Sequence, residues 1–109
     1  MATAEIVGAA YRGDTAAVTQ ILEQHADAGN VQDDRRRTAL YSAARENHTA
    51  VVDLLLARGA DPDIPNNVGS TPLHAAAFAG HGEMVDRLIA GGANTSVNNY
   101  YGSTASEEA

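Results

Sequence analysis

The side chains best suited to proton transfer or metal binding near neutral pH are the four histidines of this 109-residue sequence. Two of them, His48 and His81, are 33 positions apart and stand in two similar segments of the chain. In a repeated segment, equivalent side chains lie at successive places along the molecule. A metal site instead needs its ligands to converge on one point. The spacing of these two histidines therefore argues against a metal site.

The other reactive side chains show no pattern typical of an enzyme. No nucleophile elbow, phosphate-binding loop or dinucleotide fingerprint is present. The aspartates of 61–63 and 33–34 lack the spacing of a calcium-binding loop, and a solvated turn explains them better. The chain contains neither cysteine nor lysine, which excludes disulfides, thiolate metal sites and Schiff-base chemistry. We expect no catalytic residue, no metal and no cofactor.

Three consecutive arginines, residues 35–37, form the one concentrated charge feature. A solvated loop tip, paired with Asp33 and Asp34, is one interpretation. Another is a contact for an acidic or phosphorylated segment of a partner protein, because arginine binds oxyanions through two parallel hydrogen bonds. Nucleic acid is the third and is disfavoured, since the net charge of the chain is -7.

The same acidic charge disfavours attraction to an anionic membrane surface. No apolar stretch approaches the roughly 18 residues that a membrane-spanning helix needs. The first residues carry no basic region followed by an apolar run, so no secretory signal is visible. We expect a cytoplasmic protein, with the nucleus not excluded.

A repeat of 33 residues must position these side chains. Thr71-Pro72-Leu73-His74-Ala75-Ala76 is matched 33 positions earlier by Thr38-Ala39-Leu40-Tyr41-Ser42-Ala43, and Gly80-His81 by Asn47-His48. Pairs of apolar residues four positions apart, such as Val51-Val52 and Leu55-Leu56, predict a helix with one apolar face in each repeat. Such faces are hidden from water only when neighbouring units stack.

The repeated motif resembles that of the ankyrin-repeat family, which has T-P-L-H-x-A-A, then G-H, then G-A-D. The resemblance implies an all-α solenoid of helix-turn-helix units with projecting β-hairpin-like loops. The expected units are an N-terminal capping repeat at 3–30, repeats at 31–63 and 64–96, and a truncated fourth at 97–109, in a single domain spanning 1–109.

Six residues are assigned structural roles. Thr38 and Thr71 are expected to cap helices, and Pro72 to occupy the first helical position. The family resemblance implies that His48 and His81 bond backbone in the loop between helices, and that His74 ties one repeat to the next.

The resemblance also implies a protein–protein interaction module, an adaptor or inhibitor, that contacts another protein through loop tips and the concave face of the first helices. Tyr11, Arg45 and Phe78 share one register and should form a row on that face. Tyr100 and Tyr101 have a second interpretation, in which they fold back over the open end. The full set of expected contact residues is Tyr11, Arg12, Asp34, Arg35, Arg37, Arg45, Glu46, Asn67, Val68, Ser70, Phe78, Tyr100 and Tyr101.

Two further hypotheses remain at this stage. The apolar stripe of Met84, Val85, Leu88 and Ile89 should lack a full covering repeat, which suggests self-association or partner docking at that end. The alternative function is a small enzyme or a small-molecule-binding protein, with a pocket on the concave face near Tyr41, His74 and Phe78.

Overall fold

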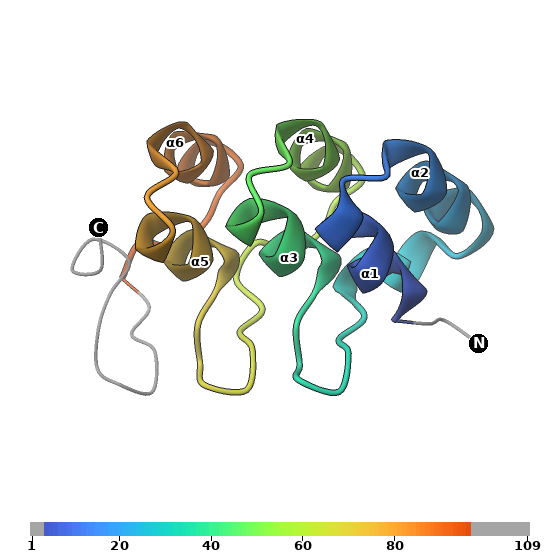
Figure 1. Ribbon diagram of the computed structural model, residues 1–109, viewed down its shortest axis with the longest axis horizontal. Helices are drawn as coiled ribbons and strands as arrows, with labels where there is room; N and C mark the ends of the chain where they lie inside the picture. Colours follow the sequence, from blue (N-terminus) through green and yellow to red (C-terminus); the bar gives the residue numbers. More distant parts are fainter. Residues whose placement is uncertain (1–3, 97–109) are drawn as a thin grey trace.

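Three helix pairs stand side by side in chain order, joined by two connections between successive pairs (Figure 1). The computed structural model describes residues 4–96, and within this range it contains helices and no strand. The all-α helical repeat predicted from the sequence is confirmed. The elements are α1 (Glu5–Arg12), α2 (Thr15–Gln24), a short 3-10 helix η1 (Ala26–Asn30), α3 (Ala39–Arg45), α4 (Thr49–Ala57), α5 (Pro72–Phe78) and α6 (Gly82–Ala90).

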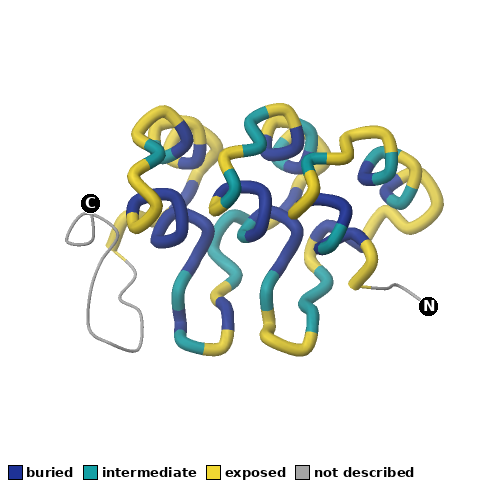
Figure 2. The backbone as a smooth tube through the Cα atoms, in the orientation of Figure 1, coloured by how far each residue is buried: buried dark blue, intermediate teal, exposed yellow. Residues whose placement is uncertain are grey.

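The first helices of the three pairs, α1, α3 and α5, form one row, and α2, α4 and α6 form a second row above it in Figure 1. Helix α3 packs against both α1 and α5. Alanine pairs make this close approach possible, because Ala9-Ala10, Ala43-Ala44 and Ala76-Ala77 are buried and add little bulk. Buried residues of this row form part of the core of the stack (Figure 2).

The second helices bury the apolar faces that the sequence predicted. Val18 and Leu22 of α2, and Val51 and Leu55 of α4, belong to the core. The last such face differs from the expectation. Met84 and Leu88 of α6 are only 1% and 0% exposed, so they do not form an open apolar end, whereas Ile89 is 45% exposed.

Threonines begin two of the first helices. The Oγ1 atom of Thr38 accepts a hydrogen bond of 3.1 Å from the backbone N–H of Tyr41. Thr71 and His74 form a reciprocal capping box, in which the Nδ1 atom of His74 accepts from the backbone N–H of Thr71 at 3.1 Å. Pro72 occupies the first turn of α5, where a missing N–H costs nothing. This contact of His74 lies within its own repeat, so the proposed tie to the next repeat stays a prediction.

Two loops project from the row of first helices (Figure 1). Each is closed by a backbone hydrogen bond, from Asp33 N–H to the Arg37 carbonyl at 3.0 Å and from Asn66 N–H to the Ser70 carbonyl at 2.8 Å. Arg36 and Gly69 occupy equivalent turns with φ of 64° and 78°. The loops also bond to each other, because the N–H of Asn67 donates to the Arg35 carbonyl at 3.1 Å. The two loops therefore support one another.

The predicted fourth repeat at 97–109, with Tyr100 and Tyr101, lies outside the described residues. The boundaries predicted for the repeats remain predictions. Within residues 4–96, no helix is long and apolar enough to cross a membrane.

Candidate functional site

Three exposed side chains occupy equivalent positions near the ends of the first helices. Their alignment in one row stays a prediction. Tyr11 near the end of α1 is 50% exposed, Phe78 at the end of α5 is 80% exposed, and Arg45 at the end of α3 is also exposed. We call these three residues the inner row. Tyrosine, phenylalanine and arginine are residue types found at the energetic centres of interfaces.

Two histidines hold the helix ends that carry this row. The Nε2 atom of His48 lies 2.9 Å from the carbonyl oxygen of Tyr11, and the Nε2 atom of His81 lies 3.1 Å from that of Arg45. Because a carbonyl oxygen only accepts, each Nε2–H is the donor. The bonds reach the first helix of the preceding repeat, which differs from the expected bond within the interhelical loop. Each histidine therefore fixes the backbone of an inner-row residue.

Gly13 makes room for the first of these rings. Its φ is 73°, and an added Cβ atom would lie 2.7 Å from the Nδ1 atom of His48. The turn after α1 thus needs glycine for both its backbone conformation and its contact with His48.

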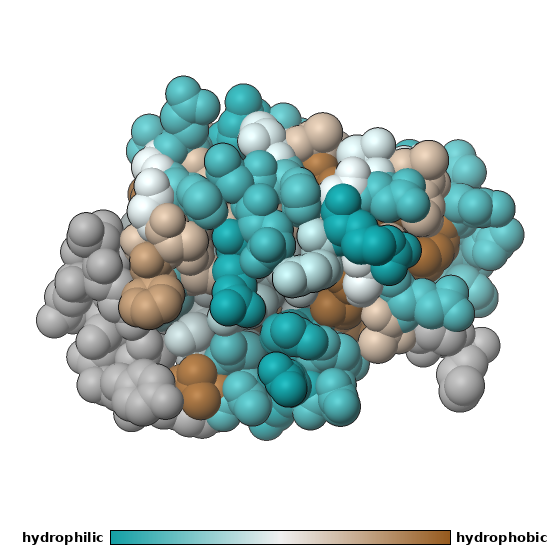
Figure 3. Space-filling view, viewed as in Figure 1, coloured by the Kyte–Doolittle hydropathy of each residue, from teal (hydrophilic) through white to brown (hydrophobic). Residues whose placement is uncertain are grey.

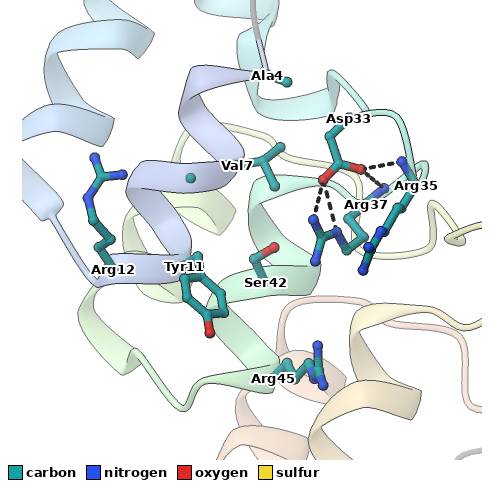
Figure 4. Close-up of a pocket in the computed structure, with 10 residues that line it drawn as sticks. Ala4, Val7, Tyr11, Arg12, Asp33, Arg35, Arg37, Ser42 and Arg45 are labelled. Carbon is teal, nitrogen blue, oxygen red and sulfur yellow. Dashed lines mark hydrogen bonds and ion pairs between the residues drawn. The ribbon is translucent and has the colours of Figure 1, made fainter.

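An open pocket of about 670 Å³ lies between α1, the loop at 31–38 and α3 (Figure 4). We call it the basic pocket, because four of its lining residues are arginines and one is an aspartate. Its lining residues are Ala4, Val7, Gly8, Tyr11, Arg12, Asp33, Arg35, Arg37, Ser42 and Arg45.

Asp33 organises the loop at the edge of the basic pocket. Its Oδ1 atom accepts from the backbone N–H groups of Arg35 at 3.0 Å and Arg37 at 2.8 Å. Its Oδ2 atom accepts from Nε of Arg37 at 2.9 Å, and the two side chains form an ion pair. Burial acts to raise the pKa of Asp33, but these hydrogen bonds and the charge of Arg37 prevail and hold the pKa below its ordinary value.

The other arginines of the basic pocket have no such partner. Within residues 4–96, the guanidinium groups of Arg12, Arg35 and Arg45 make no hydrogen bond or ion pair with a protein side chain. In Figure 4, Arg35, Arg37 and Arg45 lie on the same side as Ser42, while Arg12 points away on the far side of α1. The pocket thus presents positive charge on an otherwise acidic protein.

The structure brings together five of the predicted contact residues, because Tyr11, Arg12, Arg35, Arg37 and Arg45 all line the basic pocket. The other predicted contact residues within 4–96 do not line the basic pocket. Asp34 and Asn67 are exposed at the loop tips, and three further residues are half-buried: Glu46, Val68 and Ser70. The oxygen of the buried Asn66 side chain accepts from the N–H groups of Val68 and Ser70, both at 3.0 Å, and fixes this second tip.

Sequence reasoning missed Val7 and Ser42 as members of the site. A signal for both was present, since Val7 precedes Tyr11 by four residues and Ser42 precedes Arg45 by three. Such spacing puts side chains on one helix face. Applying this rule to each predicted contact residue identifies both.

The alternative function placed a pocket near Tyr41, His74 and Phe78. Those residues line neither the basic pocket nor a smaller pocket of about 180 Å³ beside His81 and Val85. His74 is buried and held in its capping box, and Phe78 points into open solvent at 80% exposure. The basic pocket lies one repeat nearer the N-terminus, between the first and second helix pairs. Among residues 4–96, no three acidic or histidine side chains are grouped so that they could hold a metal ion.

The sequence was also compared with known protein families. The family model described as "Ankyrin repeats (3 copies)" matches residues 6–100, most of the chain. The protein belongs to the ankyrin-repeat family. Ankyrin repeats are generally protein-interaction modules, and the family is typically non-enzymatic.

One curated relative of this ankyrin-repeat chain is a 2-5A-dependent ribonuclease from Mus musculus. It is 39% identical over 57 residues, which cover 52% of this chain and 8% of the ribonuclease. The match is to the repeat region of that enzyme. The similarity is therefore to a short part of a much longer protein.

Proposed function

We propose that this ankyrin-repeat protein is a recognition module that binds another protein through the inner row and the two loop tips, as an adaptor or inhibitor. The observation that carries the proposal is the exposure of Tyr11 and Phe78 near the ends of two first helices, α1 and α5. Each aromatic ring leaves a large apolar surface in water, and covering both by one partner would recover that free energy.

Rigidity supports the same proposal. Binding costs less when the contact residues are already held in place. His48 bonds the backbone of Tyr11, His81 bonds that of Arg45, and Asn66 bonds two residues of the second loop tip. A partner would therefore meet a surface whose backbone needs little further ordering.

The surface is also mixed in character. The view of the molecule in Figure 3 shows small separate hydrophobic spots among hydrophilic residues, without one broad apolar patch. Polar surfaces with a few aromatic anchors are typical of partners that associate and separate. This pattern suits a regulatory adaptor or inhibitor.

Photo-crosslinking tests the proposal. The photoreactive residue p-benzoylphenylalanine replaces Tyr11 or Phe78, with Gln20 and Asp86 on the second helices as exposed control positions. Cell lysate is irradiated with each variant, and conjugates are identified by mass spectrometry. We expect one protein to be captured from both Tyr11 and Phe78 and from neither control. Equal capture from all four positions, or capture from the controls alone, would contradict the proposal.

A further inference from the structure

We propose that the basic pocket binds a phosphorylated side chain of the partner protein. This inference rests on the proposed function, since it names the chemical group that the partner presents. It rests on the arrangement of Arg35, Arg37 and Arg45 around Ser42 (Figure 4).

The basic pocket is lined by arginines that have no acidic partner among residues 4–96. Asp33 pairs with the guanidinium group of Arg37 and also accepts from the backbone N–H groups of Arg35 and Arg37. This carboxylate is therefore not a partner for the guanidinium groups of the other arginines. Within the described part of the chain, Arg35 and Arg45 have no acidic partner, although the protein carries 14 acidic residues and only seven basic ones. Arg35 and Arg45 thus bring to the pocket two guanidinium charges that no carboxylate of residues 4–96 pairs with.

Hydrogen bonds hold the backbone of Arg35 and Arg45 in place. The N–H of Arg35 donates to Asp33, and its carbonyl accepts from Asn67 in the neighbouring loop. The carbonyl of Arg45 accepts from His81. The backbone of each arginine is therefore held by a hydrogen bond from a distant segment of the chain. An arrangement of this kind favours binding, because little backbone ordering remains to be done.

A phosphate group matches the charge of these two arginines better than a carboxylate does. A phosphomonoester carries a charge of about -1.5 to -2 near neutral pH and offers three acceptor oxygens. Arg35 and Arg45 match this charge and can each bind two oxygens, and Ser42 and Tyr11, which carry hydroxyl groups, also line the pocket. A single carboxylate, with a charge of -1, would balance the charge of only one of these two arginines.

The shape and lining of the pocket favour a phosphate carried by a protein segment. The pocket is open, so a small phosphate compound would keep much of its surface in water. Val7 and Ala4 line the pocket next to the arginines and offer apolar contact to residues flanking the phosphate. A long nucleic acid would meet the repulsion of a chain with net charge -7. A short phosphorylated peptide fits these conditions best.

The test uses immobilised random peptide libraries with a fixed central phosphoserine, phosphothreonine or phosphotyrosine, and the same libraries without phosphate. We expect the protein to be retained about 10-fold or more strongly on at least one phosphorylated library. The variants Arg35→Gln and Arg45→Gln should each lose this preference. Arg58→Gln, an exposed arginine outside the pocket, should keep it. Unchanged thermal unfolding of the three variants would show that they are folded.

Several results would overturn the inference. Equal retention with and without phosphate is one, and an Arg58→Gln loss as large as that of Arg35→Gln is another. Release of the protein by inorganic phosphate or phenyl phosphate as readily as by the selected phosphopeptides would contradict recognition of a protein segment. Tighter binding to a single-stranded RNA oligomer than to any phosphorylated library would also contradict it.

Phosphatase treatment of the lysate separates this inference from the proposed function. If crosslinking from Phe78 persists after treatment, protein recognition stands and the phosphate site is wrong. If crosslinking from Phe78 is absent with and without treatment, the proposed function itself is wrong. Loss of crosslinking only after treatment is the result that we expect.

Discussion

The ring of His48 donates a hydrogen bond of 2.9 Å to the carbonyl oxygen of Tyr11, 37 residues earlier in the chain. This bond connects the turn of the second repeat to the first helix of the repeat before it. The same connection recurs between His81 and Arg45. Each histidine thus has a structural role in stacking and at the same time fixes the backbone of an inner-row residue.

Replacing this histidine should weaken the stack. We expect His48→Ala to lower the free energy of unfolding by about 1–2 kcal/mol, because it removes a hydrogen bond and the ring that packs against Gly13. Urea denaturation measures the change. His25→Ala, at the exposed end of α2, is the control and should change stability by less than about 0.5 kcal/mol. Equal effects of the two substitutions would contradict the structural role of His48.

The buried face of α6 gives a second prediction. We expect Leu88→Ala to cost about 2–5 kcal/mol, because it leaves a cavity at a fully buried position. Ile89→Ala is the matched control, since Ile89 is 45% exposed and its removal should cost much less. Thermal or urea unfolding of both variants decides the matter. A small effect of Leu88→Ala would mean that this end of the stack is open, as the sequence alone suggested.

The lowered pKa of Asp33 predicts a dependence of stability on pH. A carboxyl group whose folded pKa is depressed stabilises the protein above its unfolded pKa of about 4, and this contribution is lost as pH falls through the folded pKa. Asp33→Asn should therefore destabilise the protein at neutral pH, and its difference from wild type should shrink at strongly acidic pH. Urea denaturation across a pH series measures this. Asp34→Asn, at the exposed neighbouring position, should show a smaller difference at neutral pH, and an equal difference would contradict the role of Asp33.

The sequence was informative about the fold because a repeat writes the same local pattern more than once. The 33-residue spacing of Thr38 and Thr71 marked the starts of α3 and α5, and the apolar pairs marked the second helices. These signals are local, since a cap and its helix lie within a few residues. The equivalent positions of Tyr11, Arg45 and Phe78 followed from the same register.

Contacts between repeats were harder to predict. The hydrogen-bond partner of His48 lies 37 residues earlier in the chain. Which residue becomes that partner depends on how one helix pair packs against the preceding pair. The basic pocket likewise exists only because the loop at 31–38 lies beside α1 and α3. Met84 and Leu88 were expected to be exposed, because counting repeats does not reveal how deeply the side chains of a terminal helix are buried.

The most direct test of the recognition surface compares two exposed apolar side chains on different helix rows. The partner captured by crosslinking is titrated against wild type, Phe78→Ala and Ile89→Ala, with affinity measured by calorimetry. Phe78 on α5 belongs to the inner row, whereas Ile89 lies on α6. We expect Phe78→Ala to weaken binding by about 10-fold or more, as for an aromatic anchor at an interface. Ile89→Ala should bind as wild type does. A loss with Ile89→Ala and none with Phe78→Ala would place the partner on the second helices and contradict this account.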